Sequence, residues 1–233
     1  MVSTDLSPQQ RQFLISHLSK CSTERRFEAL KQAIDERTTY FTIALENIFQ
    51  SQNASATLRT CECFGLQDVH IIENDNRFGV NPKVVMGATK WLNLYHYNAI
   101  EHNTQEAIDN LRQKGYRIVA TSPHASGVTL NEFDVLKGKF ALFFGTELTG
   151  LSQTVLDNAD EYLRVPTVGL TESLNLSVTV GVCVHTLTEK LRNSNVNYHL
   201  TDIEKELLLH QWLRHSVRSW RNIESRYLKH FEK

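Results

Sequence analysis

The sequence has few of the residues that mark metal-binding, disulfide-bonded or membrane proteins. Its 233 residues include four cysteines, Cys21, Cys61, Cys63 and Cys183, and no two of them form a CxxC pair. This spacing indicates neither a metal site nor a disulfide framework, so reduced thiols are expected. The chain also has no signal-peptide pattern and no apolar run of membrane-spanning length. Together these absences favour a cytoplasmic protein without a metal and without a membrane segment.

Net charge is also almost absent. The chain carries 25 Lys and Arg against 26 Asp and Glu, which gives a formal charge of −1 with neutral histidines. A protein that coats nucleic acid regardless of sequence usually has a clear positive excess. Any contact with RNA phosphates therefore has to be local, and the candidates for it are Arg25, Arg26, Arg37 and Arg77. The plainer alternative is that these arginines belong to solvated helix faces and loops.

Three common catalytic or nucleotide-binding motifs are missing. The sequence contains no GxGxxG, no GxxxxGK[ST] and no GxSxG. A dinucleotide fingerprint, a P-loop and the nucleophile elbow of α/β-hydrolases therefore find no support. An ordinary doubly wound nucleotide-binding protein remains as an alternative.

What the sequence does contain is an alternation of short apolar runs and helical patterns. Apolar residues make up 41% of the chain and charged residues 22%, as in a folded globular protein. The expected strands are residues 41–48, 69–72, 91–97, 116–121, 139–144 and 162–165. Helices are expected at 53–63 and 104–114 and after Ser152. This order predicts an α/β fold with a mostly parallel sheet and helices on both faces.

The two ends of the chain have a different pattern. Residues 1–38 and 193–233 are polar with apolar stripes at helical spacing, and residues 201–229 suggest one long helical tail. We therefore expect a central domain over residues 39–192 with a helical extension at each end. The basic residues of the tail, Arg214, Arg218, Arg221 and Arg226, could contact RNA phosphates, although packing on the protein itself is the plainer interpretation.

Polar residues cluster where the expected strands end. Asn53 is placed to cap the first helix after a strand, and Arg59 follows six residues later. Glu147 lies after another strand, and Ser173 and Asn175 close the loop after a third. Since open α/β sheets bind ligands at the carboxyl ends of their strands, these side chains are candidates for one site. The alternatives are a structural salt bridge for Arg59 and simple helix capping for Ser173 and Asn175.

Three of these segments, in this order, resemble the motifs of the SPOUT RNA methyltransferases. They are NASATLRTCECFG, FGTELTGLS and VPTVGLTESLNLSV, and GATKWLNL resembles the piece that follows the first motif. More narrowly, the chain is similar to the tRNA/rRNA ribose 2′-O-methyltransferase family. The resemblance implies a deep trefoil knot over about residues 140–185, S-adenosyl-L-methionine bound in it, and a homodimer. Knots are otherwise almost absent from proteins.

The resemblance also implies a role for each matching residue. The family's catalytic positions correspond to Arg59, Asn53, Glu147, Ser173 and Asn175. The positions that hold the cofactor correspond to Thr121, Gly145, Val165, Leu170 and Leu174. The implied reaction is methyl transfer to a ribose 2′-hydroxyl. Because a guanidinium keeps its proton, we expect Arg59 to orient the hydroxyl and stabilise the negative charge that develops on it.

The short helical extensions resemble those of the tRNA enzyme that methylates the D-loop guanosine at position eighteen. The expected substrate is therefore tRNA. An rRNA 2′-O-methyltransferase of the same fold is one alternative, and a non-catalytic RNA-binding or assembly protein is another. The presence of Asn53, Arg59, Glu147 and Asn175 argues against the non-catalytic alternative.

Overall fold

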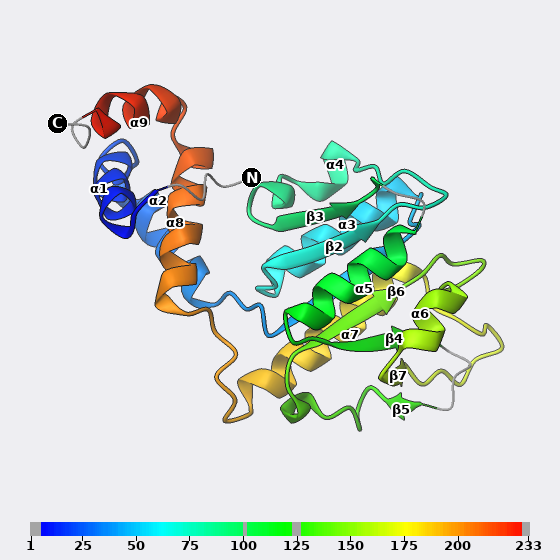
Figure 1. Cartoon of the computed structure of the whole chain (residues 1–233). Coiled ribbons are helices and arrows are strands. Elements are labelled where there is room, and N and C mark those ends of the chain that lie inside the picture. Colours follow the sequence, from blue (N-terminus) through cyan, green and yellow to red (C-terminus); the bar gives the residue numbers. More distant parts are fainter. Residues whose placement is uncertain (1–5, 100–101, 123–126, 230–233) are drawn as a thin grey trace. The chain divides into compact units, whose positions relative to one another are not determined.

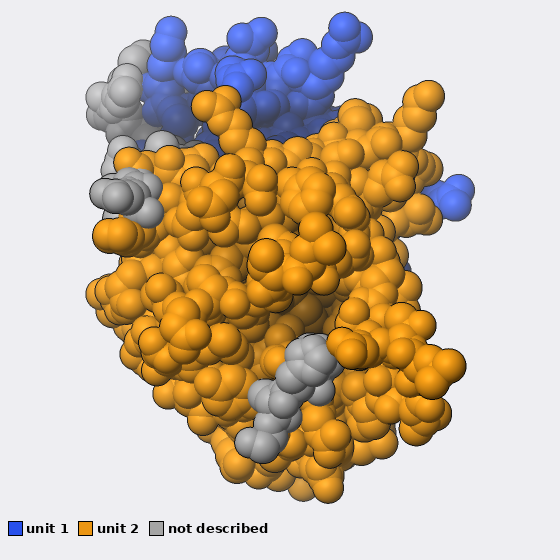
Figure 2. All heavy atoms as spheres, turned by 90° about the vertical axis from the view of Figure 1, so that its right-hand side faces the viewer, with its two compact units in different colours: residues 1–37, 199–233 blue, residues 38–198 orange. Residues whose placement is uncertain are grey.

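The computed structural model describes residues 6–99, 102–122 and 127–229. They form two compact units, one of residues 38–198 and one that joins residues up to 37 with residues from 199 (Figure 2). The sequence suggested two separate extensions bounded at residues 38 and 193. The structure instead combines the two ends in one terminal unit, and the central unit runs on to residue 198.

The central unit is built on a parallel sheet. In the described part of the chain the sheet has seven strands in the order β3-β2-β1-β6-β4-β7-β5, and every pairing is parallel (Figure 1). The strands are β1 (Phe41–Glu46), β2 (Asp68–Ile72), β3 (Asn93–Tyr97), β4 (Arg117–Thr121), β5 (Val128–Thr129), β6 (Phe140–Phe144) and β7 (Glu161–Arg164). The predicted parallel α/β fold is thus confirmed. The two-residue strand β5 was not predicted, because it is too short to leave a pattern in the sequence.

Helices cover both faces of this sheet, as predicted (Figure 1). In the central unit they are α3 (Ser51–Cys63), α4 (Pro82–Val85), the 3-10 turns η1 (Ala88–Lys90) and η2 (Val135–Lys137), α5 (Asn103–Gln113), α6 (Gln153–Asn158) and α7 (Leu176–Arg192). Helices α3 and α7 pack against each other on one face, and α5 and α6 pack on the other. Each face therefore has its own apolar core.

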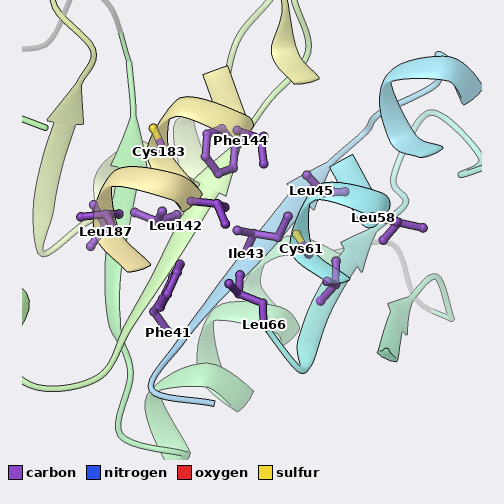
Figure 3. Close-up of a cluster of buried hydrophobic side chains, with 14 of the residues drawn as sticks. Phe41, Ile43, Leu45, Leu58, Cys61, Leu66, Leu142, Phe144, Cys183 and Leu187 are labelled. Carbon is purple, nitrogen blue, oxygen red and sulfur yellow. The ribbon is translucent and has the colours of Figure 1, made fainter. Parts of the chain in front are cut away.

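Side chains of successive strand residues alternate between these two cores. On β1, Phe41, Ile43 and Leu45 join the core under α3 and α7, whereas Ala44 joins the core under α5. Figure 3 shows the first core, where Leu142 and other strand residues meet side chains of α3 and α7. Burying each large aliphatic side chain contributes about 1.5–3 kcal/mol to the stability of the fold. The two cores therefore hold each strand in its position, and this determines which residues lie at the ends of the strands.

One helix start differs from the prediction. Helix α3 begins at Ser51 with Gln50 in the capping position, so Asn53 is not its N-cap. Asn53 lies inside the first turn and is buried, with 7% of its surface exposed. Its side-chain amide is used for contacts with another segment, described below, rather than for capping its own helix.

The terminal unit consists of α1 (Pro8–Ser19), α2 (Glu24–Asp35), α8 (Asp202–Ser216) and α9 (Trp220–Leu228). The helical tail expected over residues 201–229 is present as two helices, because the chain breaks between α8 and α9. The carboxylate of Glu224 in α9 accepts hydrogen bonds from Arg214 at 2.7 and 2.8 Å and lies 2.8 Å from the His210 ring in α8. Burial alone would raise the pKa of Glu224, but these hydrogen bonds outweigh it and lower the pKa. This ionised carboxylate holds α9 folded back on α8.

Arg37 also belongs to the terminal unit. It is 2% exposed, and its guanidinium lies 4.9 Å from the ring centroid of Trp212. The prediction that Arg37 contacts RNA is therefore not supported, since its charge is used in a cation–π contact inside the unit.

A buried histidine in the sheet gives a testable dependence on pH. The ring of His70 lies 2.9 Å from the Tyr97 hydroxyl and stacks on Tyr95, and burial together with the charge of Lys114 lowers the pKa of His70 to about 3. The ordinary value is 6.5, so between these values the unfolded chain binds one more proton than the folded chain. The free energy of unfolding should therefore fall as the pH drops below 6.5, by up to about 1.4 kcal/mol per pH unit.

We expect His70→Phe to flatten this dependence between pH 6.5 and 5, because it removes the titrating group. Urea unfolding at several pH values measures the slope. The control is the exposed His185→Gln, which should keep the slope of the unaltered protein. An identical slope in His70→Phe would show that His70 is not the group responsible.

Candidate active site

Three segments that are distant in the sequence meet at the carboxyl edge of the sheet. The β6 loop (residues 145–152) follows β6, and the β7 segment (residues 165–175) follows β7. Both leave their strands on the side where the sheet ends, next to the first turn of α3 (Figure 1). Because parallel strands end at the same edge, this convergence follows directly from the fold.

A carboxylate on the β6 loop holds these segments together. Oε1 of Glu147 accepts hydrogen bonds from the side-chain amide of Asn53 at 3.0 Å, from that of Asn175 at 2.8 Å, and from the backbone N–H of Leu176 at 3.1 Å. The two asparagines also bond directly, since the Asn175 amide donates to Asn53 Oδ1 at 3.1 Å. Three of the predicted site residues are therefore brought into one network.

The start of α7 explains why a carboxylate suits this position. Asn175 is the N-cap, and its Oδ1 accepts from the backbone N–H groups of Ser177 at 2.9 Å and Val178 at 3.4 Å. The Leu176 N–H, which has no partner within the helix, is satisfied by Glu147. The partial positive charge at the N-terminus of this 17-residue helix stabilises the negative charge of Glu147. The network is thus a rigid junction between loop and helix.

Beside this junction the surface of residues 38–198 is hollowed (Figure 2). The main cavity has a volume of about 370 Å³, and a smaller cavity of about 70 Å³ adjoins it. The two share the side chains of Thr121, Ser122, Glu172, Ser173, Leu174 and Thr179. We call them together the hollow. Its size falls in the range of about 300–1,000 Å³ that small-molecule sites occupy.

The β6 loop forms one wall of the hollow, residues 145–151. It is closed by paired backbone hydrogen bonds of 3.1 Å between Thr146 and Gly150. A Cβ atom on Gly145 would lie 2.1 Å from the Gly150 carbonyl oxygen, so only glycine fits there. The loop can therefore turn this tightly and present its backbone groups to a ligand.

Four of the five residues predicted to hold the cofactor line the hollow: Thr121, Gly145, Val165 and Leu174. Leu170 does not, since it is fully exposed on the β7 segment. The structure therefore gives no support to a cofactor contact by Leu170. Hydroxyl residues, apolar residues and the acidic residues Glu147 and Glu172 make up the rest of the wall.

Ser173 and Arg59 are placed differently from the other predicted catalytic residues. Ser173 lines the hollow without joining the Glu147 network. Arg59 is exposed on α3, and in the described part of the chain it has no hydrogen-bond or ion-pair partner, so the alternative of a structural salt bridge finds no support. It lies about 9 Å beyond Asn53 along the helix axis, and its side chain leans back toward the start of the helix. Asn53 and Arg59 thus share a helix but not a contact.

Some residues of the wall were not predicted. Ser122 and Glu172 adjoin predicted residues, and Thr179 and Cys183 lie four and eight positions after Asn175. That spacing places both on the same face of α7 as Asn175, which is the signal that could have identified them. Burial raises the pKa of the Cys183 thiol to about 12, so this cysteine acts as an apolar wall residue.

The predicted RNA contacts are spread over both units. Arg25 and Arg26 are exposed on α2 of the terminal unit, and Arg77 is exposed between β2 and α4 of the central unit. Within the described residues there is no group of three or more side chains that could hold a metal ion. No helix among them is long and apolar enough to cross a membrane.

Comparison with known proteins finds relatives over most of this chain. Residues 40–185 match the family described as "SpoU rRNA Methylase family". A protein of Borreliella burgdorferi named tRNA (guanosine(18)-2′-O)-methyltransferase is 43% identical over 91% of this chain and 94% of its own length. A Thermus thermophilus protein of the same name is 28% identical over 82% of this chain and 97% of its own length.

Solved structures show the same fold. The Aquifex aeolicus protein described as a TrmH/SpoU tRNA modifying enzyme has a TM-score of 0.72 at 23% identity, over 83% of this chain and 98% of that chain. The SpoU methyltransferase AviRb of Streptomyces viridochromogenes, solved in complex with the cofactor AdoMet, has a TM-score of 0.58 at 18% identity, over 70% of this chain and 65% of that chain.

The family match begins at the first strand of the sheet and ends within α7, so it contains all three segments that meet at Glu147. The predicted resemblance is thereby confirmed. The chain belongs to the SpoU rRNA methylase family.

Proposed function

We propose that this protein methylates the ribose 2′-oxygen of the guanosine at position 18 of tRNA, with S-adenosyl-L-methionine as the methyl donor. The observation that carries the choice of substrate is the 43% identity, over nearly the full length of both chains, to a relative with that name. The site supports the reaction, because Asn53, Glu147 and Asn175 meet beside a hollow of about 370 Å³, a size typical of small-molecule sites.

Ribosomal RNA is the second candidate, since the family description names it. Sequence similarity favours tRNA. The Borreliella burgdorferi relative, which is named for a tRNA substrate, is 43% identical to this chain, whereas a solved rRNA methyltransferase of Sinorhizobium meliloti is 19% identical. A tRNA substrate also supports a cytoplasmic location. A non-catalytic role would require neither the intact network around Glu147 nor the exposed Arg59 on the same helix as Asn53.

The hollow would hold the donor through its backbone and its hydroxyl groups. The backbone of the β6 loop and the hydroxyls of Thr121 and Ser122 supply polar contacts, and Val165 and Leu174 supply apolar ones. S-adenosyl-L-methionine would supply a methyl group on a positively charged sulfur, which makes that carbon electrophilic. The chain then has two tasks, to place the ribose hydroxyl against that methyl group and to stabilise the oxygen as it attacks.

Arg59 is the residue we assign to the second task. Its guanidinium stays protonated at any physiological pH, so it cannot act as a general base. It can donate hydrogen bonds to the ribose oxygen and stabilise the negative charge that grows there. Glu147 and Asn53 bond to one another, so they position the walls and take no part in proton transfer. Holding donor and acceptor side by side contributes much of the remaining rate enhancement.

The trefoil knot is part of this proposal. The order of the strands supports it, because the chain leaves β4 for the edge strand β5, returns to β6 on the other side of β4, and then crosses β4 again to reach β7. The β7 segment then meets the β6 loop at Glu147 and enters α7. Connections that cross the same strand repeatedly bring the loops at one edge of the sheet together, and a knotted backbone requires this arrangement.

A homodimer is also part of the proposal. Helix α7 has an exposed apolar stripe of Val178, 49% exposed, and Val182, 38% exposed, which lie four residues apart on one helix face. Phe49 is 51% exposed and Leu174 is 40% exposed in the segments that precede α3 and α7. Exposed apolar residues grouped in this way are typical of a surface that another chain covers.

Methyl transfer to tRNA tests the proposed function directly. The purified protein should transfer one labelled methyl group from S-adenosyl-L-methionine to an unmodified tRNA transcript, at the guanosine of position 18. A transcript with 2′-deoxyguanosine at that position should accept none, because it lacks the attacking oxygen. Methylation of the deoxy transcript, or no binding of S-adenosyl-L-methionine in calorimetry, would contradict the proposal.

In the same assay, Arg59→Ala should lower turnover by about 10²–10³-fold, because it removes a charge that stabilises the transition state. Its affinity for S-adenosyl-L-methionine should stay within about twofold of the unaltered protein, since no wall of the hollow depends on Arg59. The control is Arg192→Ala at the far end of α7, which should keep full turnover. Full turnover in Arg59→Ala would exclude the proposed role.

The dimer is tested by Val178→Asp. A carboxylate on the exposed stripe should prevent its burial against a second chain, so light scattering should show the mass of one chain, whereas the unaltered protein should show the mass of two. The matched control is Ile203→Asp, a 70% exposed residue of α8, which should remain dimeric. A Val178→Asp protein that is still dimeric would exclude this stripe as the interface.

A further inference from the structure

A carboxylate that is buried, unlike the exposed Glu147, also lies at the carboxyl edge of the sheet, and the reaction described above does not use it. Glu46 is the last residue of β1 and is 1% exposed. Its Oε1 accepts hydrogen bonds from the hydroxyls of Thr104 and Ser152, both at 2.7 Å, and its Oε2 accepts from the backbone N–H of Ser152 at 2.8 Å. A buried charge is costly unless it is compensated in this way, so its presence calls for an explanation.

The partners of Glu46 connect it to the β6 loop. Ser152 is the last residue of that loop and the N-cap of α6. It is held at both its backbone and its side chain by the same carboxylate. The other partner, Thr104, lies in the first turn of α5. Glu46 therefore attaches the end of the loop to the interior strand β1 and, through Thr104, to the start of α5.

The β6 loop thus has two anchors of the same kind. Glu147, in the middle of the loop, binds α3 and the start of α7. Glu46, which lies on β1 and not on the loop, binds Ser152 at the end of the loop. Between the two anchors lie residues 148–151, which line the hollow. A loop fixed only at Glu147 would be free to move at the end that closes the wall.

We propose that Glu46 is a positioning residue that keeps this wall of the hollow in the shape that binds the methyl donor. The identity of the donor rests on the function proposed above, whereas the mechanical role of Glu46 does not. The proposal predicts that removing the carboxylate weakens donor binding by more than the loss of stability explains.

Two substitutions at Glu46 distinguish positioning from simple burial. Glu46→Leu removes every acceptor and should raise the dissociation constant for S-adenosyl-L-methionine about tenfold or more. Glu46→Gln should rescue binding to within about threefold. Its amide can turn so that the carbonyl accepts from Ser152 N–H while the NH₂ group donates to the two hydroxyls.

The matched control for stability is Thr42→Val on the same strand. Thr42 is fully buried, and its hydroxyl donates to the Asp68 carbonyl at 2.7 Å, at the end of β1 away from the hollow. This variant should lose thermal stability and keep the affinity of the unaltered protein. If Glu46→Leu does not fold, Ser152→Ala removes one of the same hydrogen bonds from the other side and should weaken binding in the same direction.

Hydrogen exchange of the free protein provides a readout that does not involve the donor. In Glu46→Leu the Ser152 amide should exchange at least about tenfold faster than in the unaltered protein, and in Thr42→Val it should not. If the unaltered protein fails to bind S-adenosyl-L-methionine, the proposed function is wrong, and this exchange rate still tests Glu46. The inference is overturned if Glu46→Leu binds the donor with unchanged affinity, or if its Ser152 amide exchanges at the original rate.

Discussion

One carboxylate oxygen determines how the polar edge of this protein is assembled. Glu147 Oε1 accepts from an amide 94 residues earlier in the chain, from an amide 28 residues later, and from the first backbone N–H of α7. None of these donors is charged, so the carboxylate is stabilised by hydrogen bonds and by the dipole of the helix. The wall of the hollow, the start of α7 and the first turn of α3 all take their positions from this contact.

This arrangement separates binding from chemistry. The residues that meet at Glu147 satisfy one another's hydrogen bonds, which makes them good supports and poor acid–base catalysts. Arg59 lies outside the network with its charge available. In the proposed reaction it is the group that acts on the ribose oxygen, while the network keeps the two loops in place. The hollow itself is lined by hydroxyl residues, apolar residues and the two acidic residues Glu147 and Glu172.

Much of this could be predicted from the sequence, for a physical reason. Apolar runs such as residues 139–144 indicate the strands, and parallel strands bring the loops that follow them to one edge. The meeting of Asn53, Glu147 and Asn175 could therefore be predicted. Features that depend on tertiary contacts could not be predicted from the sequence. The break between α8 and α9 depends on Glu224, the burial of Arg37 depends on Trp212, and the contact of Glu46 with Ser152 joins residues 106 positions apart.

The central claim is that Glu147 holds the start of α7, and one amide reports on it directly. The measurement is the hydrogen-exchange rate of the Leu176 N–H in Glu147→Ala, with Glu172→Ala on the β7 segment as the control. The account predicts that exchange becomes about tenfold faster or more in Glu147→Ala and stays unchanged in the control, because only Glu147 accepts this hydrogen bond. An unchanged rate in Glu147→Ala would contradict the account.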